Sequence, residues 1–73
     1  MAQEIIEAPI TGKIISVPAK AGAKVNEGDT LCILESMKME NPILAPVSGT
    51  VKEIKVSEGQ VVKTGDLLAT IEY

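Results

Sequence analysis

The chain contains no histidine, no arginine and no tryptophan, and its 73 residues include a single cysteine and a single aromatic side chain, Tyr73. A lone cysteine cannot form an internal disulfide, and this fits a reducing compartment such as the cytoplasm. Without histidine, neither a histidine-based catalytic triad nor an ordinary zinc site can be assembled. Seven lysines stand against ten acidic residues, giving a net charge of -3. This acidic chain therefore lacks the positive charge and the stacking platforms of a nucleic-acid-binding protein.

Long apolar runs are also missing, since the longest uninterrupted one spans the four residues Leu31 to Leu34. No segment is long enough to cross a bilayer, and the N-terminus has no basic start followed by an apolar stretch, so we expect neither membrane insertion nor a signal peptide. Apolar residues still make up 45% of the chain, nearly all of them aliphatic. We therefore expect one small domain, residues 1–73, with an aliphatic core.

An internal repeat with an offset of 37 residues organises the sequence. Without gaps, the segment Ala8–Gly12 overlies Ala45–Gly49, and Gly22–Asp29 overlies Gly59–Asp66. All six glycines fall into pairs under this offset. Two copies are too few for a solenoid, so the repeat predicts two half-domains, about 1–36 and 38–73, that share one core around an approximate two-fold axis.

The residues between the turn signals are short runs rich in Ile, Val, Leu and Thr, which is typical of strands. We predict eight strands, four in each half: Glu4–Glu7, Lys13–Val17, Lys24–Val25, Thr30–Glu35, Glu40–Leu44, Val51–Val56, Val61–Val62 and Leu67–Glu72. The apolar positions of Val51–Val56 depart from period two, which indicates a bulge. Gly28-Asp29 and Gly65-Asp66 are predicted to be turns, and Cys32 is predicted to be an inert core residue.

The stretch from Asp29 to Asn41 contains good helix formers and no Gly or Pro, so a helix is the alternative there. Its repeat partner, Asp66–Tyr73, is too short for a comparable helix and carries Thr70. Because matched copies should share a fold, we predict a β-hairpin with its tip at Ser36–Met39. Residue 38 is the repeat counterpart of residue 1, so the chain termini should lie together at the pole opposite Lys38.

This tip has an unusual composition, because two methionines flank Lys38 where hairpins usually place Asn, Asp or Gly. Met37 and Met39 could fold back onto the body, leaving Lys38 as an ordinary solvated charge. Alternatively, exposed methionines suit a surface that several partners touch. A catalytic lysine needs a pocket, which an exposed tip does not offer. We therefore expect Lys38 to be modified rather than catalytic.

The segment Glu35-Ser36-Met37-Lys38-Met39-Glu40 resembles the attachment motif of the biotinyl, or biotin carboxyl carrier, domain of the biotin/lipoyl attachment family. The resemblance extends from about Ile5 to Glu72 and includes both Gly-x-x-Val-x-x-Gly-Asp segments. It implies a flattened β-barrel, or barrel-sandwich hybrid, of two four-stranded antiparallel sheets. It also implies covalent biotin on Lys38, with Met37 and Met39 as flanking recognition residues and Glu35 and Ser36 as parts of the motif.

The resemblance further implies a carrier without catalytic or metal-binding residues of its own. Biotin protein ligase would load Lys38, and carboxybiotin would then travel between a biotin carboxylase site and a carboxyltransferase or decarboxylase site. Related lipoyl domains of 2-oxo-acid dehydrogenase complexes typically carry Asp-Lys-Ala at the tip, so Met37 and Met39 favour biotin. The ungapped repeat leaves no room for the inserted thumb of some relatives, which indicates the thumbless type. An unmodified barrel used only for assembly is the remaining alternative.

Overall fold

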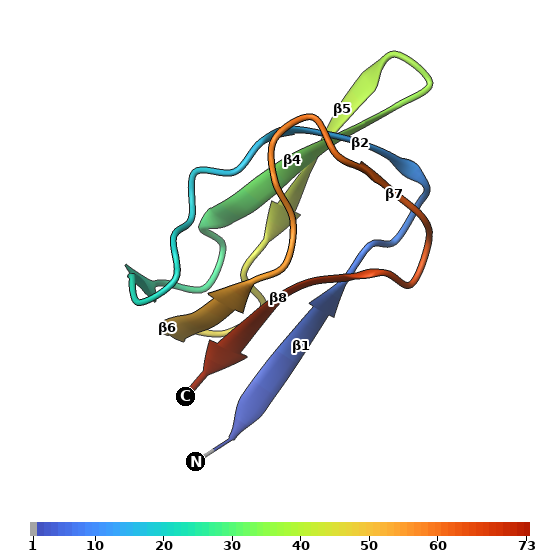
Figure 1. The fold of residues 1–73 in the computed structure, drawn as a ribbon. Helices are drawn as coiled ribbons and strands as arrows, with labels where there is room; N and C mark the ends of the chain where they lie inside the picture. Colours follow the sequence, from blue (N-terminus) through green and yellow to red (C-terminus); the bar gives the residue numbers. More distant parts are fainter. Residues whose placement is uncertain (1) are drawn as a thin grey trace.

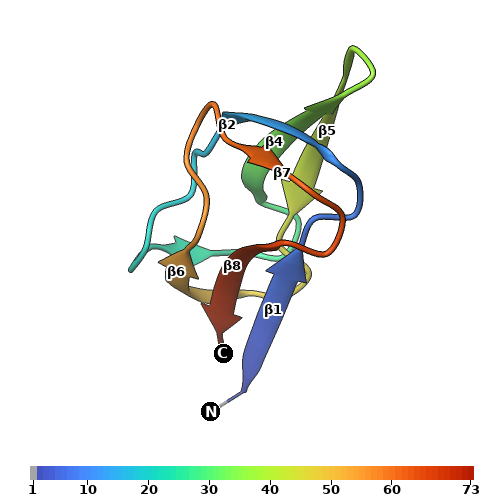
Figure 2. The same cartoon turned by 45° about the vertical axis from the view of Figure 1, so that its right-hand side comes forward.

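The structure, a computed structural model, describes residues 2–73, and these form eight β-strands arranged in two layers (Figures 1 and 2). No helix occurs among the described residues, so none of adequate length and apolarity to cross a membrane is present there. The strands are β1 (Gln3–Glu7), β2 (Gly12–Ser16), β3 (Lys24–Val25), β4 (Thr30–Ser36), β5 (Met39–Leu44), β6 (Gly49–Ile54), β7 (Val61–Val62) and β8 (Leu67–Glu72).

The strands form two four-stranded sheets with the orders β1-β8-β6-β3 and β5-β4-β2-β7, and all neighbouring strands are antiparallel. The predicted all-β fold class is confirmed, and the alternative helix over 29–41 is wrong because this stretch forms most of the hairpin β4–β5. The two half-domains predicted to share one core are interwoven in the structure, because each sheet takes two strands from each half.

The 37-residue repeat is visible in the irregularities of the sheets as well as in their order. The register of the β2–β4 pair shifts between Ile14 and Ser16, and that of the β6–β8 pair shifts at the equivalent place, between Val51 and Glu53. The bulge predicted in this region is therefore confirmed. Strand β6 begins at Gly49 and ends at Ile54, each two residues earlier than predicted. It ends earlier because the chain leaves the sheet after Ile54, and the side chain of Val56 is buried in the core.

The core between the two sheets is aliphatic, as the composition predicted. Seven side chains are less than 2% exposed, and they come from both sheets: Ile14, Leu31, Leu34, Val51, Val62, Leu68 and Ile71. Burying such a side chain contributes about 1.5–3 kcal/mol to folding. Cys32 belongs to this core, and burial raises the pKa of its thiol, so its predicted role as a packing residue is consistent with its surroundings.

Four turns carry glycine at a left-handed backbone position, with φ between 89° and 93° at Gly22, Gly28, Gly59 and Gly65. Glycine adopts this region without the steric penalty of a Cβ atom. The carboxylate of Asp29 accepts a hydrogen bond of 2.8 Å from the backbone N–H of Asn26, and Asp66 accepts the equivalent one from Lys63 at 2.8 Å. The turns predicted at Gly28-Asp29 and Gly65-Asp66 are thus confirmed.

Candidate functional site: the tip of the β4–β5 hairpin

The hairpin β4–β5 extends beyond the body of the protein at the pole opposite the chain termini (Figures 1 and 2). The molecule measures 36 × 18 × 17 Å along its principal axes. At the terminal pole, the N–H of Ala2 donates to the carbonyl of Tyr73 at 2.9 Å, and the reverse bond is also 2.9 Å. The prediction that the chain termini lie together, with the tip at the far end, is confirmed from Ala2 and Tyr73, and Met1 lies outside the described residues.

The two poles are copies of one another. The last pair of the hairpin is Ser36 opposite Met39, and the 37-residue offset places this pair on Tyr73 and Ala2. The same strand pairing therefore closes both ends of the molecule. At one end the strands are joined by the residues Met37 and Lys38, and at the other they are the ends of the chain. The backbone pairing is thus the same at both poles, and the tip adds a two-residue turn to it.

Both turn residues adopt a left-handed conformation, with φ of 52° at Met37 and 65° at Lys38. Two consecutive positive φ values between paired strands define a type I′ turn, which normally contains Asn-Gly or a similar pair. For other residues the left-handed region costs roughly 1–2 kcal/mol each. In residues 2–73, these are the two non-glycine residues with positive φ. Backbone strain maintained at one place indicates a functional constraint there.

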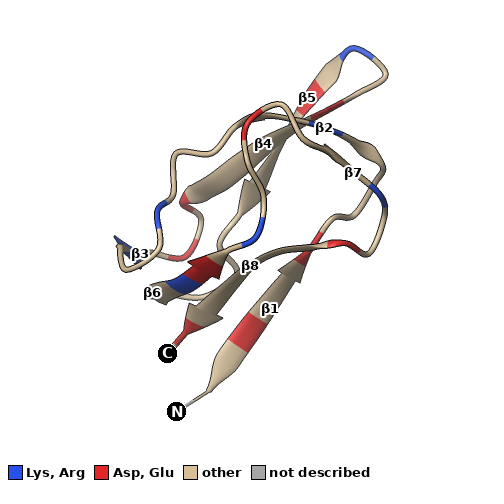
Figure 3. Cartoon of the chain, in the orientation of Figure 1, with Lys and Arg blue, Asp and Glu red and all other residues tan. Residues whose placement is uncertain are grey.

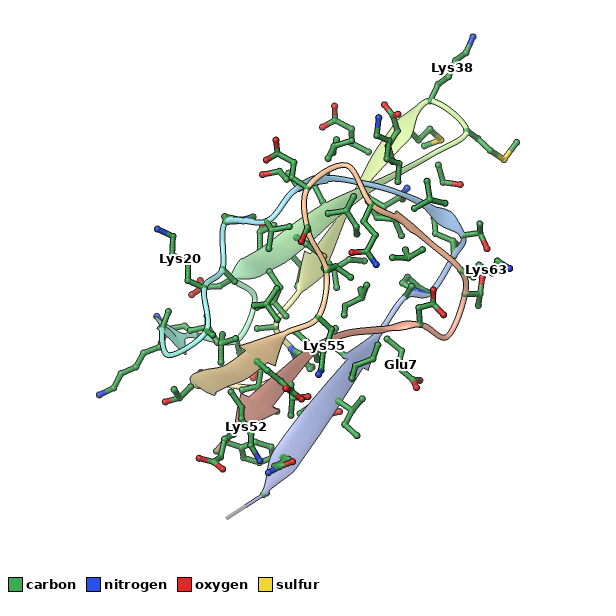
Figure 4. All side chains as sticks on the ribbon, in the orientation of Figure 1. Glu7, Lys20, Lys38, Lys52, Lys55 and Lys63 are labelled. Atoms are coloured by element: carbon green, nitrogen blue, oxygen red, sulfur yellow. The ribbon has the colours of Figure 1, made fainter. Side chains whose placement is uncertain are left out.

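The lysine and both methionines of the tip are exposed to solvent. Figure 4 shows the side chain of Lys38 extending away from the hairpin and the body. Met37 is 93% exposed and Met39 67% exposed, so the alternative in which they fold back onto the body is wrong. Within the described residues, the one ion pair joins Lys55 Nζ to Glu53 Oε2 at 3.3 Å, leaving Lys38 without a carboxylate partner there. The amine of Lys38 is therefore accessible from solvent.

Two carboxylates lie directly opposite each other just below the turn. Glu35 on β4 pairs with Glu40 on β5, and both are exposed on the hairpin (Figure 3). Like charges in directly opposed cross-strand positions destabilise a sheet. At the other pole, the equivalent pair is Glu72 opposite Gln3, which avoids this repulsion. The acidic pair is therefore a distinctive property of the hairpin end of the fold rather than of the repeat.

Two supporting residues were missed by the sequence analysis. The side-chain amide of Asn41 donates to the carbonyls of Met39 at 3.3 Å and Leu34 at 3.5 Å, bracing the hairpin from inside. Gly12 on β2 lies so close to β4 that an added Cβ would collide with the backbone carbonyl of Glu35. The pairing of Gly12 with Gly49 under the repeat was the available signal, because Gly49 meets the carbonyl of Glu72 in the same way.

The motif residues predicted from the sequence are thus brought together on one hairpin: Glu35, Ser36, Met37, Lys38 and Met39. Ser36 is half-buried, and the other four are exposed. No group of three His, Cys, Asp or Glu side chains in residues 2–73 is arranged to hold a metal ion. A primary amine with free access at a projecting turn is chemically suited to covalent acylation, so the tip fits an amide-linked cofactor such as biotin.

Comparison with known proteins agrees with this geometry. Residues 3–71 match the family model described as "Biotin-requiring enzyme". The gamma subunit of methylmalonyl-CoA decarboxylase from Veillonella parvula is 55% identical over 42 residues, covering 58% of this chain and 33% of that subunit. A biotinylated protein, the TB7.3 homologue of Mycolicibacterium smegmatis, is 48% identical over 42 residues, covering 58% of this chain and 59% of that protein.

Among solved structures, the urea carboxylase of Kluyveromyces lactis is similar with a TM-score of 0.90 and 35% identity, over 99% of this chain and 6% of the carboxylase. The chain therefore spans a third or less of the decarboxylase subunit and of the carboxylase. These relatives support the biotinyl interpretation over the lipoyl one. The chain belongs to the family of biotin-requiring enzymes, as a non-catalytic biotinyl carrier domain.

Proposed function

We propose that Lys38 is the residue that carries biotin, and that Met37, Met39, Glu35 and Ser36 form the surface by which a biotin protein ligase recognises it. The observation that carries this proposal is the strained, non-glycine turn that presents an exposed amine between two exposed methionines. The four other turns described above have glycine at their left-handed positions. The tip therefore retains Met and Lys although the backbone there favours other residues.

The attachment step requires only an activated biotin and the amine of this chain. The deprotonated amine of Lys38 attacks the carbonyl carbon of the biotinyl adenylate that the ligase supplies. A C–N amide bond forms, the C–O bond to AMP breaks, and the amine loses a proton to a base of the ligase. The positive φ of Lys38 supports this step because it directs the side chain away from both strands, so the ligase can approach without steric interference from the body.

When bound, biotin supplies a ring nitrogen that can accept and release a carboxyl group. We infer that this domain carries that group between a biotin carboxylase site and a carboxyltransferase or decarboxylase site on partner domains or subunits. The chain contributes positioning: Lys38 and the chain ends lie at opposite poles of a body 36 Å long. A tether attached at either terminus would leave the tip free to enter both sites. Tethering of this kind supplies effective concentrations on the order of millimolar.

The same proposal treats residues 1–73 as one domain that cannot be divided at its repeat. Each sheet contains strands from both halves, so neither 1–36 nor 38–73 can form a complete sheet alone. We also propose that loading occurs in the cytoplasm, a placement supported by the free, buried thiol of Cys32.

Intact-mass measurement after co-expression with a biotin ligase tests the proposal. The wild-type chain should gain the mass of one biotinyl group, and Lys38→Arg should gain none. Lys63→Arg is the matched control, because Lys63 is also an exposed loop lysine, but at a glycine-containing turn (Figure 4). A biotinylated Lys38→Arg chain would refute the assignment of the lysine. The mass of a lipoyl group, or no modification of the wild type, would instead favour the lipoyl carrier or the unmodified assembly module.

A further inference from the structure

The two sheets have four edge strands, and three of them are poor templates for further pairing. The edges β3 and β7 contain two residues each. The edge β5 contains Pro42, which has no N–H to donate. The remaining edge, β1, has five residues without proline or glycine. Proteins normally blunt such edges because an open one pairs with other chains.

Hydrogen-bond alternation shows which groups of β1 face outward. Ala2 and Tyr73 exchange both hydrogen bonds, so along an antiparallel pair the next positions alternate between bonded and non-bonded. Ile5, opposite Thr70, then falls in a non-bonded pair, and its N–H and C=O point away from β8 to the free edge. The same reasoning applies to Gln3.

The repeat supplies a direct comparison for this edge. Pro42 on β5 is the counterpart of Ile5, and its partner Ile33 is the counterpart of Thr70. Proline at this position removes the one outward donor that Ile5 retains. The two copies of this edge therefore differ in backbone donors: β5 lacks the central outward N–H at Pro42, whereas β1 retains its equivalent at Ile5.

The side chains of β1 indicate which kind of strand could pair with this edge. Ile5 is 59% exposed, so most of this large apolar side chain is in contact with solvent in the described residues. Glu4 and Glu7 flank it, and Glu72 lies on the neighbouring strand opposite Gln3. Neither β1 nor β8 contains a lysine, so this edge is acidic (Figure 3).

We propose that the β1 edge docks an extended, basic segment of a partner protein, which adds to the sheet as a fifth strand with an apolar residue against Ile5. Backbone bonds to the outward groups of Gln3 and Ile5 would supply the affinity, and a lysine or arginine beside Glu7 would supply the charge match. Docking there leaves the tip uncovered, because β1 begins at the terminal pole, opposite the hairpin β4–β5 (Figure 1).

A second copy of this chain is a poorer occupant. Both copies would carry the same acidic edge, and the net charge of -3 adds repulsion. A five-residue edge also offers far less than the ~1,200 Å² of buried area typical of a stable protein interface. A small contact of this size suits a transient association.

The test is an NMR titration of the ¹⁵N-labelled chain with the capped peptide Lys-Thr-Val-Thr-Lys, whose central valine is designed to lie beside Ile5. The amides of Gln3 and Ile5 should shift most, and the acidic peptide Glu-Thr-Val-Thr-Glu should bind at least ten-fold more weakly. Ile5→Pro should also weaken binding at least ten-fold while keeping the fold, because proline is already accommodated at the equivalent position 42.

The converse variant, Pro42→Ile, should open the other edge and add peptide-induced shifts along β5. Unchanged binding by Ile5→Pro, equal binding of the two peptides, or largest shifts away from β1 would overturn the proposal. So would a concentration-dependent dimer through β1 in the absence of peptide, since the occupant would then be a second copy. Biotinylation of Lys38 tests the proposed function independently of this docking proposal. Because Ile5→Pro leaves the tip intact, this variant should still be biotinylated.

Discussion

Replacing the two turn residues with the pair that their backbone favours should stabilise the protein and abolish its loading. In Met37→Asn/Lys38→Gly, the type I′ turn would contain Asn-Gly, the preferred sequence for this geometry. Met37 is 93% exposed, so its removal sacrifices almost no burial. Relief of the left-handed conformation returns about 1–2 kcal/mol per residue. Glycine at position 38 lowers the free energy of unfolding by about 0.5–1 kcal/mol, because it makes the unfolded chain more flexible.

The expected net gain is about 1–3.5 kcal/mol in the free energy of unfolding, and each kcal/mol corresponds to roughly 4–8 °C in melting temperature for a domain of this size. Urea denaturation of the unmodified chain, followed by circular dichroism, measures it. The matched control is Met39→Gly, because Met39 is also exposed but lies in β5 without a positive φ, and glycine there should destabilise. A double variant no more stable than the wild type would show that the turn is not strained, and the argument from strain to function would fail.

Three further changes test the surroundings of the tip. Glu40→Gln should stabilise the chain by about 0.2–1 kcal/mol at low salt, because it removes the repulsion from Glu35, and this gain in urea denaturation should shrink as salt is added. Gly12→Ala should destabilise it by about 1–3 kcal/mol and slow biotinylation, because the new Cβ would displace the backbone of Glu35 at the base of the hairpin; normal stability would contradict this contact. Burial raises the pKa of the Cys32 thiol, so its stabilising contribution is complete below the unfolded pKa and is lost as pH rises through the folded value. Stability should therefore fall above about pH 9, and Cys32→Ala should show a shallower fall in the same urea series.

Most of the fold could be predicted from the repeat, because the offset of 37 residues fixed the number of strands and the relation between the poles. The prediction of a hairpin over residues 29–41 depended on this repeat, since local propensity alone allowed a helix there. The interweaving of the halves could not be predicted. Sheet partners are chosen by contacts between distant segments, and the repeat is equally compatible with two separate or two mixed sheets.

The residues of the tip could be predicted because their composition is unusual for a turn, whereas their supports could not. Asn41 donates to a backbone carbonyl on β4 and Gly12 lies against another carbonyl of that strand, and apart from the repeat pairing of Gly12 with Gly49 the sequence gives no sign of this proximity. The difference between the open edge at Ile5 and the closed edge at Pro42 also required the strand order. Proline in β5 is visible in the sequence, but only the topology shows that both residues lie on outer strands.

The equivalence of the Ala2–Tyr73 and Met39–Ser36 pairs has a consequence for engineering. A circular permutant could be made by joining Tyr73 to Ala2 through a Met-Lys dipeptide that replaces Met1, and by opening the chain between residues 37 and 38. It would keep the same eight strands and carry its new lysine at the present terminal pole. The two poles share one backbone pairing, so the side chains around the turn, rather than the fold, distinguish the proposed attachment end from the end where the chain terminates.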